Sequence, residues 1–150
     1  MTQREYYPHS TTTTSTSVNT VTFQRSGVGA NPKITPSGSA GTADFGIGIV
    51  GADYITFDGI DIEPLNNTVE FGYYVANAST TNGAQFNTIK NTKITMFNTA
   101  TGIAGIRTAV PSTPASAAGT NSNNTFKNLT IGNAYRSIWF VGNSTNRDEA

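Results

Sequence analysis

The sequence has no cysteine and a single histidine, and only 12% of its residues are charged. Without cysteine, disulfides and thiol chemistry are excluded, which is compatible with an exported protein that does not rely on disulfides. The lone histidine, His9, lies in a polar leading segment, so a histidine-centred metal site or catalytic triad is excluded. Nine basic side chains balance nine acidic ones, and no basic stripe indicates binding to nucleic acid.

Long hydrophobic runs and helical periodicity are also missing. The longest apolar runs are far too short to span a bilayer, so no membrane insertion is expected. No segment repeats its apolar residues with the period of a helix, whereas short apolar–polar alternations recur throughout. Asparagine, threonine, serine and glycine dominate, as is typical of strands and tight turns. The composition therefore predicts an all-β protein.

Three related stretches organise the chain. They are YITFDGIDI at 54–62, NTIKNTKI at 87–94 and NTFKNLTI at 124–131. When Phe57, Ile89 and Phe126 are placed in register, each has a threonine directly before it and an isoleucine five residues after it. The spacing is 32 residues from Phe57 to Ile89 and 37 from Ile89 to Phe126, which is typical of solenoid repeats. We therefore expect these three residues to stack in one interior column on adjacent parallel strands.

A second motif alternates with the first. Its copies are GIGIV at 46–50, GYYVA at 72–76, GIAGI at 102–106 and SIWFV at 137–141. A weaker copy of the first motif, VTFQ, lies at 21–24. One repeat thus holds two short strands, and the chain is predicted to form a parallel β-helix solenoid of about three to four coils.

The repeats also predict a structural ladder of turn residues. The inward–outward alternation skips one position at Gly59, Asn91 and Asn128, where a bend with a left-handed backbone would restore it. Glycine and asparagine tolerate that conformation best. Stacked coils would hold the two asparagine side chains about 4.8 Å apart, so that their amides bond along the stack.

Outward side chains of opposite charge face each other in successive repeats. Asp58 falls beside Lys90, and Asp61 falls beside Lys93, which predicts two exposed ion pairs between adjacent strands. The alternative role for the two carboxylates is catalysis, but three residues apart across a bend they point to different sides. No catalytic residue, metal site or cofactor is predicted.

The ends of the sequence differ from its middle. Residues 1–19 form a polar lead-in rich in threonine and serine, which favours a linker, although threonine also suits an edge strand. Residues 20–150 form the β-helix segment, which is expected to be incomplete at its C-terminus because no capping element follows the last strand. Residues 1–10 lack the apolar region of a signal peptide. The loop 109–122 is expected to project from the body.

The phrase GADYITFDGI at 51–60, with NTIKN at 87–91 and NTFKN at 124–128, resembles the repeats of the pectin-lyase-like superfamily of right-handed parallel β-helices. Similar repeats occur in large secreted and cell-surface proteins of Bacteroidota. The resemblance covers residues 21–141 and implies a right-handed parallel β-helix in a secreted or surface-located protein. Lyases of this group typically use aspartate-rich calcium sites, and no acidic cluster recurs here. Because the superfamily also includes hydrolases, adhesins and spacers, the resemblance does not fix an activity.

Two aromatic residues are the candidates for ligand binding. The second motif, aligned by its inward residues, places Tyr74 and Trp139 outward in one column with Gly48 and Ala104. Exposed rings beside small residues suit the stacking of sugar rings. Two alternatives stay open: a neighbouring loop such as 109–122 covers both rings, or the strand phase differs by one residue, which would exchange Tyr73 for Tyr74. The same alignment gives one inward column: Ile47, Tyr73, Ile103 and Ile138.

The leading functional prediction is a non-catalytic module of a larger exported or cell-surface protein, acting in adhesion or glycan binding. Its predicted partners are a cell-surface or extracellular polysaccharide and the neighbouring domains of the same protein. The scarcity of charge favours a neutral ligand. Two alternatives stay open: a polysaccharide lyase or glycoside hydrolase, and a structural spacer without a ligand.

Overall fold

The computed structural model describes residues 15–41 and 43–148, and this part of the chain is almost entirely β-structure. Its strands have two to six residues, and its one helix is a 3-10 helix of three residues. The elements are β1 (Val21–Gln24), β2 (Lys33–Ile34), β3 (Phe45–Val50), β4 (Ile55–Asp58), β5 (Asp61–Ile62), β6 (Phe71–Ala76), β7 (Thr88–Lys90), β8 (Lys93–Thr95), β9 (Ala104–Ala109), η1 (Ala117–Gly119), β10 (Thr125–Lys127), β11 (Thr130–Gly132) and β12 (Arg136–Trp139).

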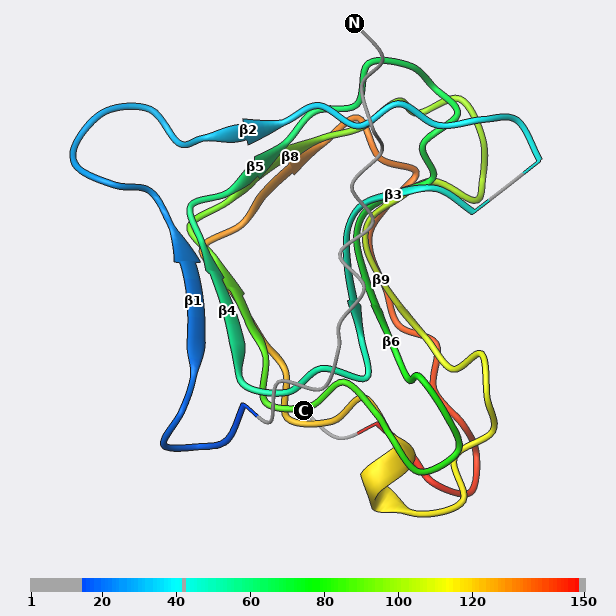
Figure 1. Cartoon of the computed structure of the whole chain (residues 1–150). Coiled ribbons are helices and arrows are strands. Elements are labelled where there is room, and N and C mark those ends of the chain that lie inside the picture. The colour runs from blue at the N-terminus through cyan, green and yellow to red at the C-terminus, as the bar shows by residue number, and fades with distance from the viewer. Residues whose placement is uncertain (1–14, 42, 149–150) are drawn as a thin grey trace, which may run out of the picture.

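The strands stack in three parallel sheets. Sheet A has the order β1-β4-β7-β10, sheet B has β11-β8-β5-β2, and sheet C has β12-β9-β6-β3. Each sheet takes one strand from every turn of the chain, so the strands form a β-solenoid of about four turns (Figure 1). All strand pairings within the sheets are parallel. The predicted all-β parallel solenoid is confirmed.

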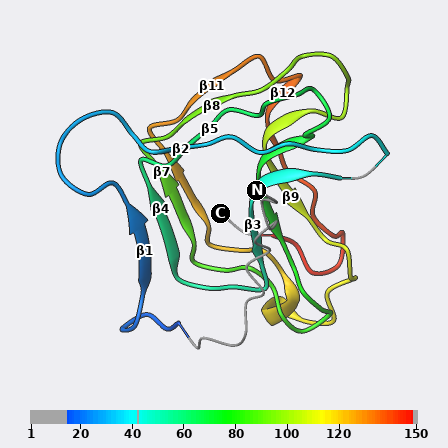
Figure 2. The same ribbon diagram turned by 45° about the horizontal axis from the view of Figure 1, so that its top comes forward.

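The solenoid is right-handed. In Figure 1 the chain runs clockwise from β1 through β2 to β3. In Figure 2, where the top has come forward, β5, β8 and β11 lie progressively higher than β2, so later turns lie farther from the viewer of Figure 1. A chain that winds clockwise while it recedes is right-handed, and parallel crossover connections almost always take this hand.

The repeats set the register between turns. Phe57 on β4 pairs with Ile89 on β7, and Ile89 pairs with Phe126 on β10. Phe23 on β1 extends this column into the first turn, where its ring stacks on Phe57 with centroids 4.9 Å apart. The strands of sheet B form a second column of isoleucines: Ile34, Ile62, Ile94 and Ile131.

One alignment predicted from the sequence is wrong. In the third turn Ile106, not Ile103, pairs with Tyr73 on the preceding turn. Arg107, not Ala104, therefore joins the outward column of the two candidate aromatic residues. Both isoleucines are buried, at 2% and 0% exposed, so the hydrophobic pattern fits either register. Ile103 belongs to the turn before β9 rather than to the strand.

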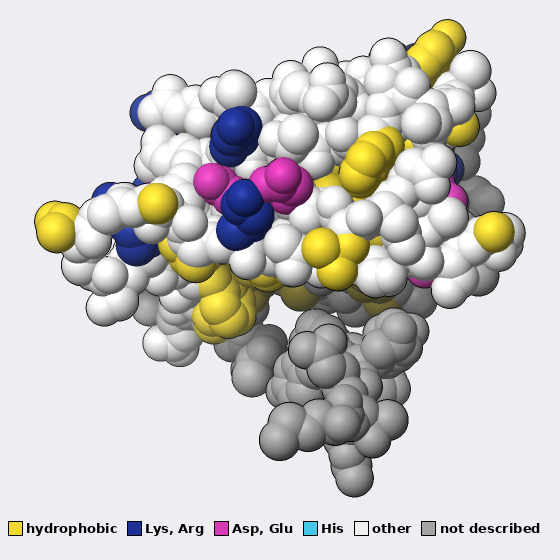
Figure 3. Space-filling view, turned by 90° about the horizontal axis from the view of Figure 1, so that it is seen from above, with side chains coloured by type: hydrophobic (Ala, Val, Ile, Leu, Met, Phe, Trp, Pro, Cys, Tyr) yellow, Lys and Arg dark blue, Asp and Glu magenta, His cyan; other side chains and the backbone are white. Residues whose placement is uncertain are grey.

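The core lies between the three sheets and is best covered in the second and third turns. Tyr73 and Ile94 have no exposed surface, and the Tyr73 hydroxyl donates a 2.8 Å hydrogen bond to the carbonyl of Ile60. Burial raises the pKa of that hydroxyl. The first turn is more open, since Phe23 is 49% exposed and Ile34 is 38% exposed. In Figure 3, hydrophobic side chains lie along the lower margin of the described surface.

The residues of the predicted ladder all adopt the left-handed conformation. Gly59, Asn91 and Asn128 have φ of 69°, 55° and 51°. The Asn128 amide donates to the side-chain carbonyl of Asn91 at 3.1 Å, and the Asn91 amide donates to the Asp58 carboxylate at 2.7 Å. At Gly59 a Cβ would lie 2.9 Å from the Asn31 side-chain oxygen. The φ at this position suits glycine or asparagine, and a side chain here would also displace the Asn31 side chain.

We predict that Asn91→Ala lowers the free energy of unfolding by about 1–3 kcal/mol, because alanine is strained at this φ and loses both hydrogen bonds of the amide. Asn91→Gly keeps the conformation and loses only the hydrogen bonds, so it should cost less. Urea denaturation of the two variants measures the difference. Equal losses would show that asparagine is not needed here for its backbone conformation.

The first of the two predicted ion pairs forms. The Lys90 ammonium lies 3.2 Å from the Asp58 carboxylate across the paired strands β4 and β7. The hydrogen bond from Asn91, followed by the interaction with Lys90, holds the pKa of Asp58 below its usual value. The pair is exposed enough to mark the register more than to stabilise it.

The second predicted ion pair, between Asp61 and Lys93, does not form. The Asp61 carboxylate instead accepts the backbone N–H of Lys93 at 2.8 Å and the amide of Asn31 at 2.9 Å. A backbone N–H has no freedom to find another partner, whereas an ammonium remains hydrated at the surface. The other ion pair of the described residues joins Lys33 to Glu63. Figure 3 shows acidic and basic side chains side by side on this face.

Most of the predicted lead-in, residues 1–14, lies outside the described residues. Thr16 and Asn19 exchange two backbone hydrogen bonds of 3.1 Å and so form a turn. Ser15 donates a 2.6 Å hydrogen bond to the carbonyl of Asp53 and ties this turn to the second coil. The division between 1–19 and 20–150 stays a prediction.

The loop 109–122 packs on the loop 77–86 of the preceding turn, and the two loops extend together from the corner between sheets C and A (Figure 1). Gly83 donates its N–H to the carbonyl of Ala118 at 2.8 Å. A Cβ on Gly83 would lie 2.5 Å from the carbonyl carbon of Thr120 and closer still to its oxygen. The close approach of two backbones, which requires glycine, is the physical reason for the packed loop.

Candidate functional site

Both candidate aromatic residues lie on the outer face of sheet C. Tyr74 on β6 and Trp139 on β12 flank Arg107 on β9 in one register column. Gly48 on β3 completes the column in the first turn. All three large side chains are partly buried. The structure thus brings Tyr74 and Trp139 to one surface and inserts an arginine between them.

A neighbouring column adds further large groups to this face. Phe45, Phe71, Ala104 and Arg136 pair in register at the starts of the same four strands. The small residues make room, since a Cβ on Gly48 would lie 2.6 Å from the Phe45 ring. We call the six large residues of the two columns the outer ladder: Phe45, Phe71, Tyr74, Arg107, Arg136 and Trp139.

The rings in the first half of the outer ladder stack on one another. The Tyr74 ring stacks on the rings of Phe45 and Phe71, with centroids 5.1 and 5.7 Å apart. Phe71 is only 2% exposed although it lies outside the main core cluster, because its neighbours Tyr74 and Arg107 in the outer ladder cover its ring. Burial raises the pKa of Tyr74, and the charge of Arg107 opposes this effect.

Two guanidinium groups occupy the second half of the outer ladder. The Arg107 guanidinium lies 4.8 Å from the Phe71 ring centroid and 4.4 Å from that of Trp139. The Arg136 guanidinium lies 4.1 Å from the Trp139 centroid and donates to the carbonyl of Thr101. Among the described residues no carboxylate forms an ion pair with either arginine, and the Arg107 Nε is buried without a hydrogen-bond partner.

This arrangement differs from the open stacking platform that the sequence suggests. The rings of Tyr74 and Trp139 already contact phenyl rings or guanidinium groups. Aromatic and cation–π contacts of this kind contribute about 0.5–2 kcal/mol each, so the side chains hold one another in place. Guanidinium N–H groups fixed in this way can bind a carboxylate or sulfate in a bidentate geometry.

A second candidate surface, which the sequence analysis did not identify, lies at the corner that precedes sheet A. Tyr54, Phe86 and Asn123 stand at equivalent positions before β4, β7 and β10, with φ of 54°, 55° and 60°. The two rings stack with centroids 4.9 Å apart and planes 3° from parallel. The sequence does hold a signal, because an aromatic residue recurs two positions before the repeat threonine in the first two copies. We call these three residues the corner column.

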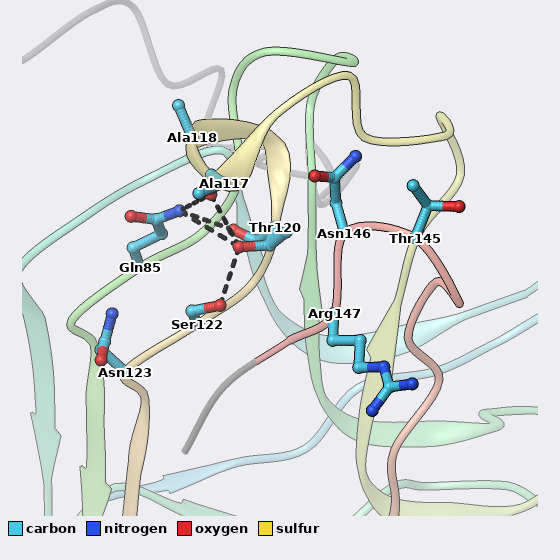
Figure 4. Close-up of a pocket in the computed structure, with 9 residues that line it drawn as sticks. All are labelled: Gln85, Ala117, Ala118, Thr120, Ser122, Asn123, Thr145, Asn146 and Arg147. Carbon is cyan, nitrogen blue, oxygen red and sulfur yellow. Dashed lines mark hydrogen bonds between the residues drawn. The ribbon is translucent and has the colours of Figure 1, made fainter.

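An open pocket of ≈ 450 Å³ adjoins the corner column. Its walls come from Gln85, from η1 and the segment after it, and from residues 145–147 (Figure 4). The Gln85 side-chain amide donates to the carbonyls of Ala117 at 2.7 Å and Thr120 at 3.0 Å. These bonds, drawn in Figure 4, fix the loop 109–122 against Gln85 of the third turn and so give the pocket a defined wall.

The carboxylates considered for catalysis are both engaged. Asp58 pairs with Lys90, and Asp61 accepts hydrogen bonds from a backbone N–H and an amide. Among residues 15–41 and 43–148, no group of three or more acidic, histidine or cysteine side chains is placed to hold a metal ion. The same residues contain no helix with the length and apolar character needed to cross a membrane.

Comparison of the chain with protein-family models, curated proteins and solved structures gives no match. The parallel β-solenoid therefore rests on the structure described above. The likeness to the pectin-lyase-like superfamily, the Bacteroidota-type origin and the larger protein context stay predictions from the sequence.

Proposed function

We propose that this chain is a non-catalytic β-solenoid module of a larger exported or cell-surface protein, and that its outer ladder binds an extracellular polysaccharide in adhesion. The observation that carries the proposal is the pair of arginines over Trp139. Arg107 and Arg136 lie on one face without a carboxylate partner among the described residues. Partly buried cations usually pair with an anion, so the unfilled partner is assigned to a ligand.

The position of the arginines changes the expected ligand class. The balanced and sparse charge of the whole sequence favours a neutral glycan. Two guanidinium groups on adjacent turns of sheet C instead favour an acidic glycan that carries carboxylate or sulfate groups. The parts of the Tyr74 and Trp139 rings that stay exposed would offer apolar contact to the sugar.

Neither alternative has a comparable observation in its favour. A glycoside hydrolase needs two carboxylates free to act on one bond, and Asp58 and Asp61 are both held by other groups. In a spacer without a ligand the cation–π contacts would serve stability alone, and the lack of a carboxylate partner for both arginines among the described residues would have no role. Binding in adhesion is therefore the function we favour for this face.

We predict that Arg107→Gln weakens binding to dextran sulfate or alginate about 10-fold or more, because a charge-assisted hydrogen-bond donor is lost. Trp139→Ala should weaken binding at least as much, since both guanidinium groups lose the ring that holds them. Its cost in stability should fall below the roughly 3–5 kcal/mol of a fully buried aromatic residue, because Trp139 is partly exposed. Calorimetric titration and thermal melting of the same samples measure both effects.

The matched control is Lys127→Gln, which removes one positive charge from the exposed face of sheet A. Binding to acidic polymers should also fall as salt is added, because exposed charges are screened. Equal affinity for dextran sulfate and uncharged dextran would contradict the proposal. Equal losses in Arg107→Gln and Lys127→Gln would reduce the effect to net charge and would contradict it too.

A further inference from the structure

The corner column holds two bulky aromatic residues in a backbone conformation that suits them poorly. Tyr54 and Phe86 have φ of 54° and 55°, a region that glycine and asparagine favour. The equivalent residue in the fourth turn, Asn123, meets the same geometry with a side chain that tolerates it. Strained backbone of this kind gathers at functional sites, where the rest of the fold offsets its cost.

Phe86 has one ring face that no aromatic neighbour covers. Tyr54, on the preceding turn, stacks on its other face at 4.9 Å. On the following turn the neighbour is Asn123, whose side chain is much smaller than a phenyl ring. The Phe86 N–H donates to the carbonyl of Ser122 at 3.2 Å and fixes that turn beside it. Phe86 stays 43% exposed. The column therefore has a step where the large Phe86 ring is followed by the smaller Asn123 side chain.

The open pocket adjoins this step. Gln85, which precedes Phe86 in the chain, and Asn123, its column neighbour, both line it. Figure 4 shows these two side chains on one side of the pocket and Asn146 and Arg147 on the other. Amide and hydroxyl side chains dominate the lining, which also includes one arginine and, among the described residues, no carboxylate.

We infer that Phe86 and this pocket form a binding site for a neutral sugar ring, separate from the outer ladder and independent of it. The C–H face of a pyranose packs well on an aromatic ring. Its hydroxyl groups both donate and accept hydrogen bonds, which suits amide and hydroxyl side chains better than a row of like charges. The volume of ≈ 450 Å³ lies within the range of small-ligand sites. The outer ladder, by contrast, selects for negative charge.

The test is an NMR titration of the ¹⁵N-labelled 150-residue chain with cellohexaose, mannohexaose and chitohexaose. At least one of these neutral probes should shift the backbone amides of Gln85, Phe86 and Asn123, and leave those of β12 unchanged. Phe86→Asn, which copies the fourth turn, should weaken that binding about 10-fold or more. The same variant should melt within about 3 °C of the parent, because asparagine relieves the strained φ as the ring stack is lost.

The matched control is Phe97→Asn, since Phe97 is 37% exposed and follows β8, whereas Phe86 follows Gln85 in the chain and shares a column with Asn123, both of which line the pocket. It should bind the probe as the parent does. The inference is overturned if none of the three probes shifts the corner amides, or if Phe86→Asn binds like the parent. A Phe86→Asn variant that melts far below the parent would assign the ring a structural role and also overturn it. Arg107→Gln should not affect this titration, so the two proposals fail separately.

Discussion

Replacing Gly83 with alanine is expected to lower the free energy of unfolding by about 3 kcal/mol or more. The new Cβ would lie 2.5 Å from the carbonyl carbon of Thr120 and closer still to its oxygen. Neither atom belongs to a flexible side chain, so the backbone of one loop must move away. The hydrogen bond from Gly83 to the carbonyl of Ala118 would be lost with it. The pocket should open as well, because Thr120 lines it.

Gly102→Ala is the matched control for this prediction. A Cβ at Gly102 would meet no atom within 4 Å, and no left-handed φ restricts the residue. We expect its free energy of unfolding to stay within about 0.5 kcal/mol of the parent value. Urea denaturation followed by circular dichroism measures both variants. A Gly83→Ala chain as stable as the Gly102→Ala chain would show that the two loops do not approach each other closely.

Truncation of Ile94 to alanine is expected to cost about 3–5 kcal/mol, because its side chain is fully buried between neighbouring isoleucines of sheet B. The same truncation of Ile34, which stands in the same column but is 38% exposed, should cost less than about 1.5 kcal/mol. Ile131 is partly buried and should fall between the two. The three variants remove the same atoms, so burial alone orders their stabilities.

Thermal and chemical denaturation of the three variants give this order directly. A cost for Ile34→Ala equal to that of Ile94→Ala would mean that the first turn is covered as well as the third. That result would contradict the 38% exposure of Ile34 on β2. If Ile94→Ala instead caused the smallest loss in the free energy of unfolding, the centre of the core would lie elsewhere.

The register of the solenoid can be predicted from the sequence because each turn repeats the same local requirement. Phe57, Ile89 and Phe126 have equivalent neighbours on both sides, so only one alignment satisfies all of them. The bend residues are predictable for a simpler reason. Few residue types tolerate a left-handed backbone, and Asn91 and Asn128 belong to them.

The errors arise where two solutions fit the local sequence equally well. Ile103 and Ile106 are both buried, and only the course of the preceding turn decides which one enters β9. In the next turn Lys93 offers Asp61 two possible partners, its side-chain ammonium and its backbone N–H. The Asp61 carboxylate accepts the backbone N–H. The position of the loop 109–122 depends on Gly83, more than twenty residues earlier, which no local pattern reveals.

The candidate surfaces are predictable only in part. Strand alternation is enough to direct Tyr74 and Trp139 outward. Their neighbours come from other turns, so the error at Ile103 also hides the contact between Arg107 and Trp139. The corner column escapes prediction for a different reason. An aromatic residue with positive φ contradicts the ordinary preference of its type, and a sequence argument built on preferences excludes it.

Because the strands pair turn upon turn, each residue finds its sheet partners in the coil before it and the coil after it. Such a molecule behaves as a one-dimensional lattice, in which interior units have two neighbours and terminal units have one. We therefore expect opening to begin at the first and last coils of this 150-residue chain, and the amide protons of β6 and β7 to exchange with solvent more slowly than those of β1 and β2. On this expectation, resistance to unfolding varies along the solenoid axis and is greatest in the coils that contain Tyr73 and Ile94, whose side chains are fully buried.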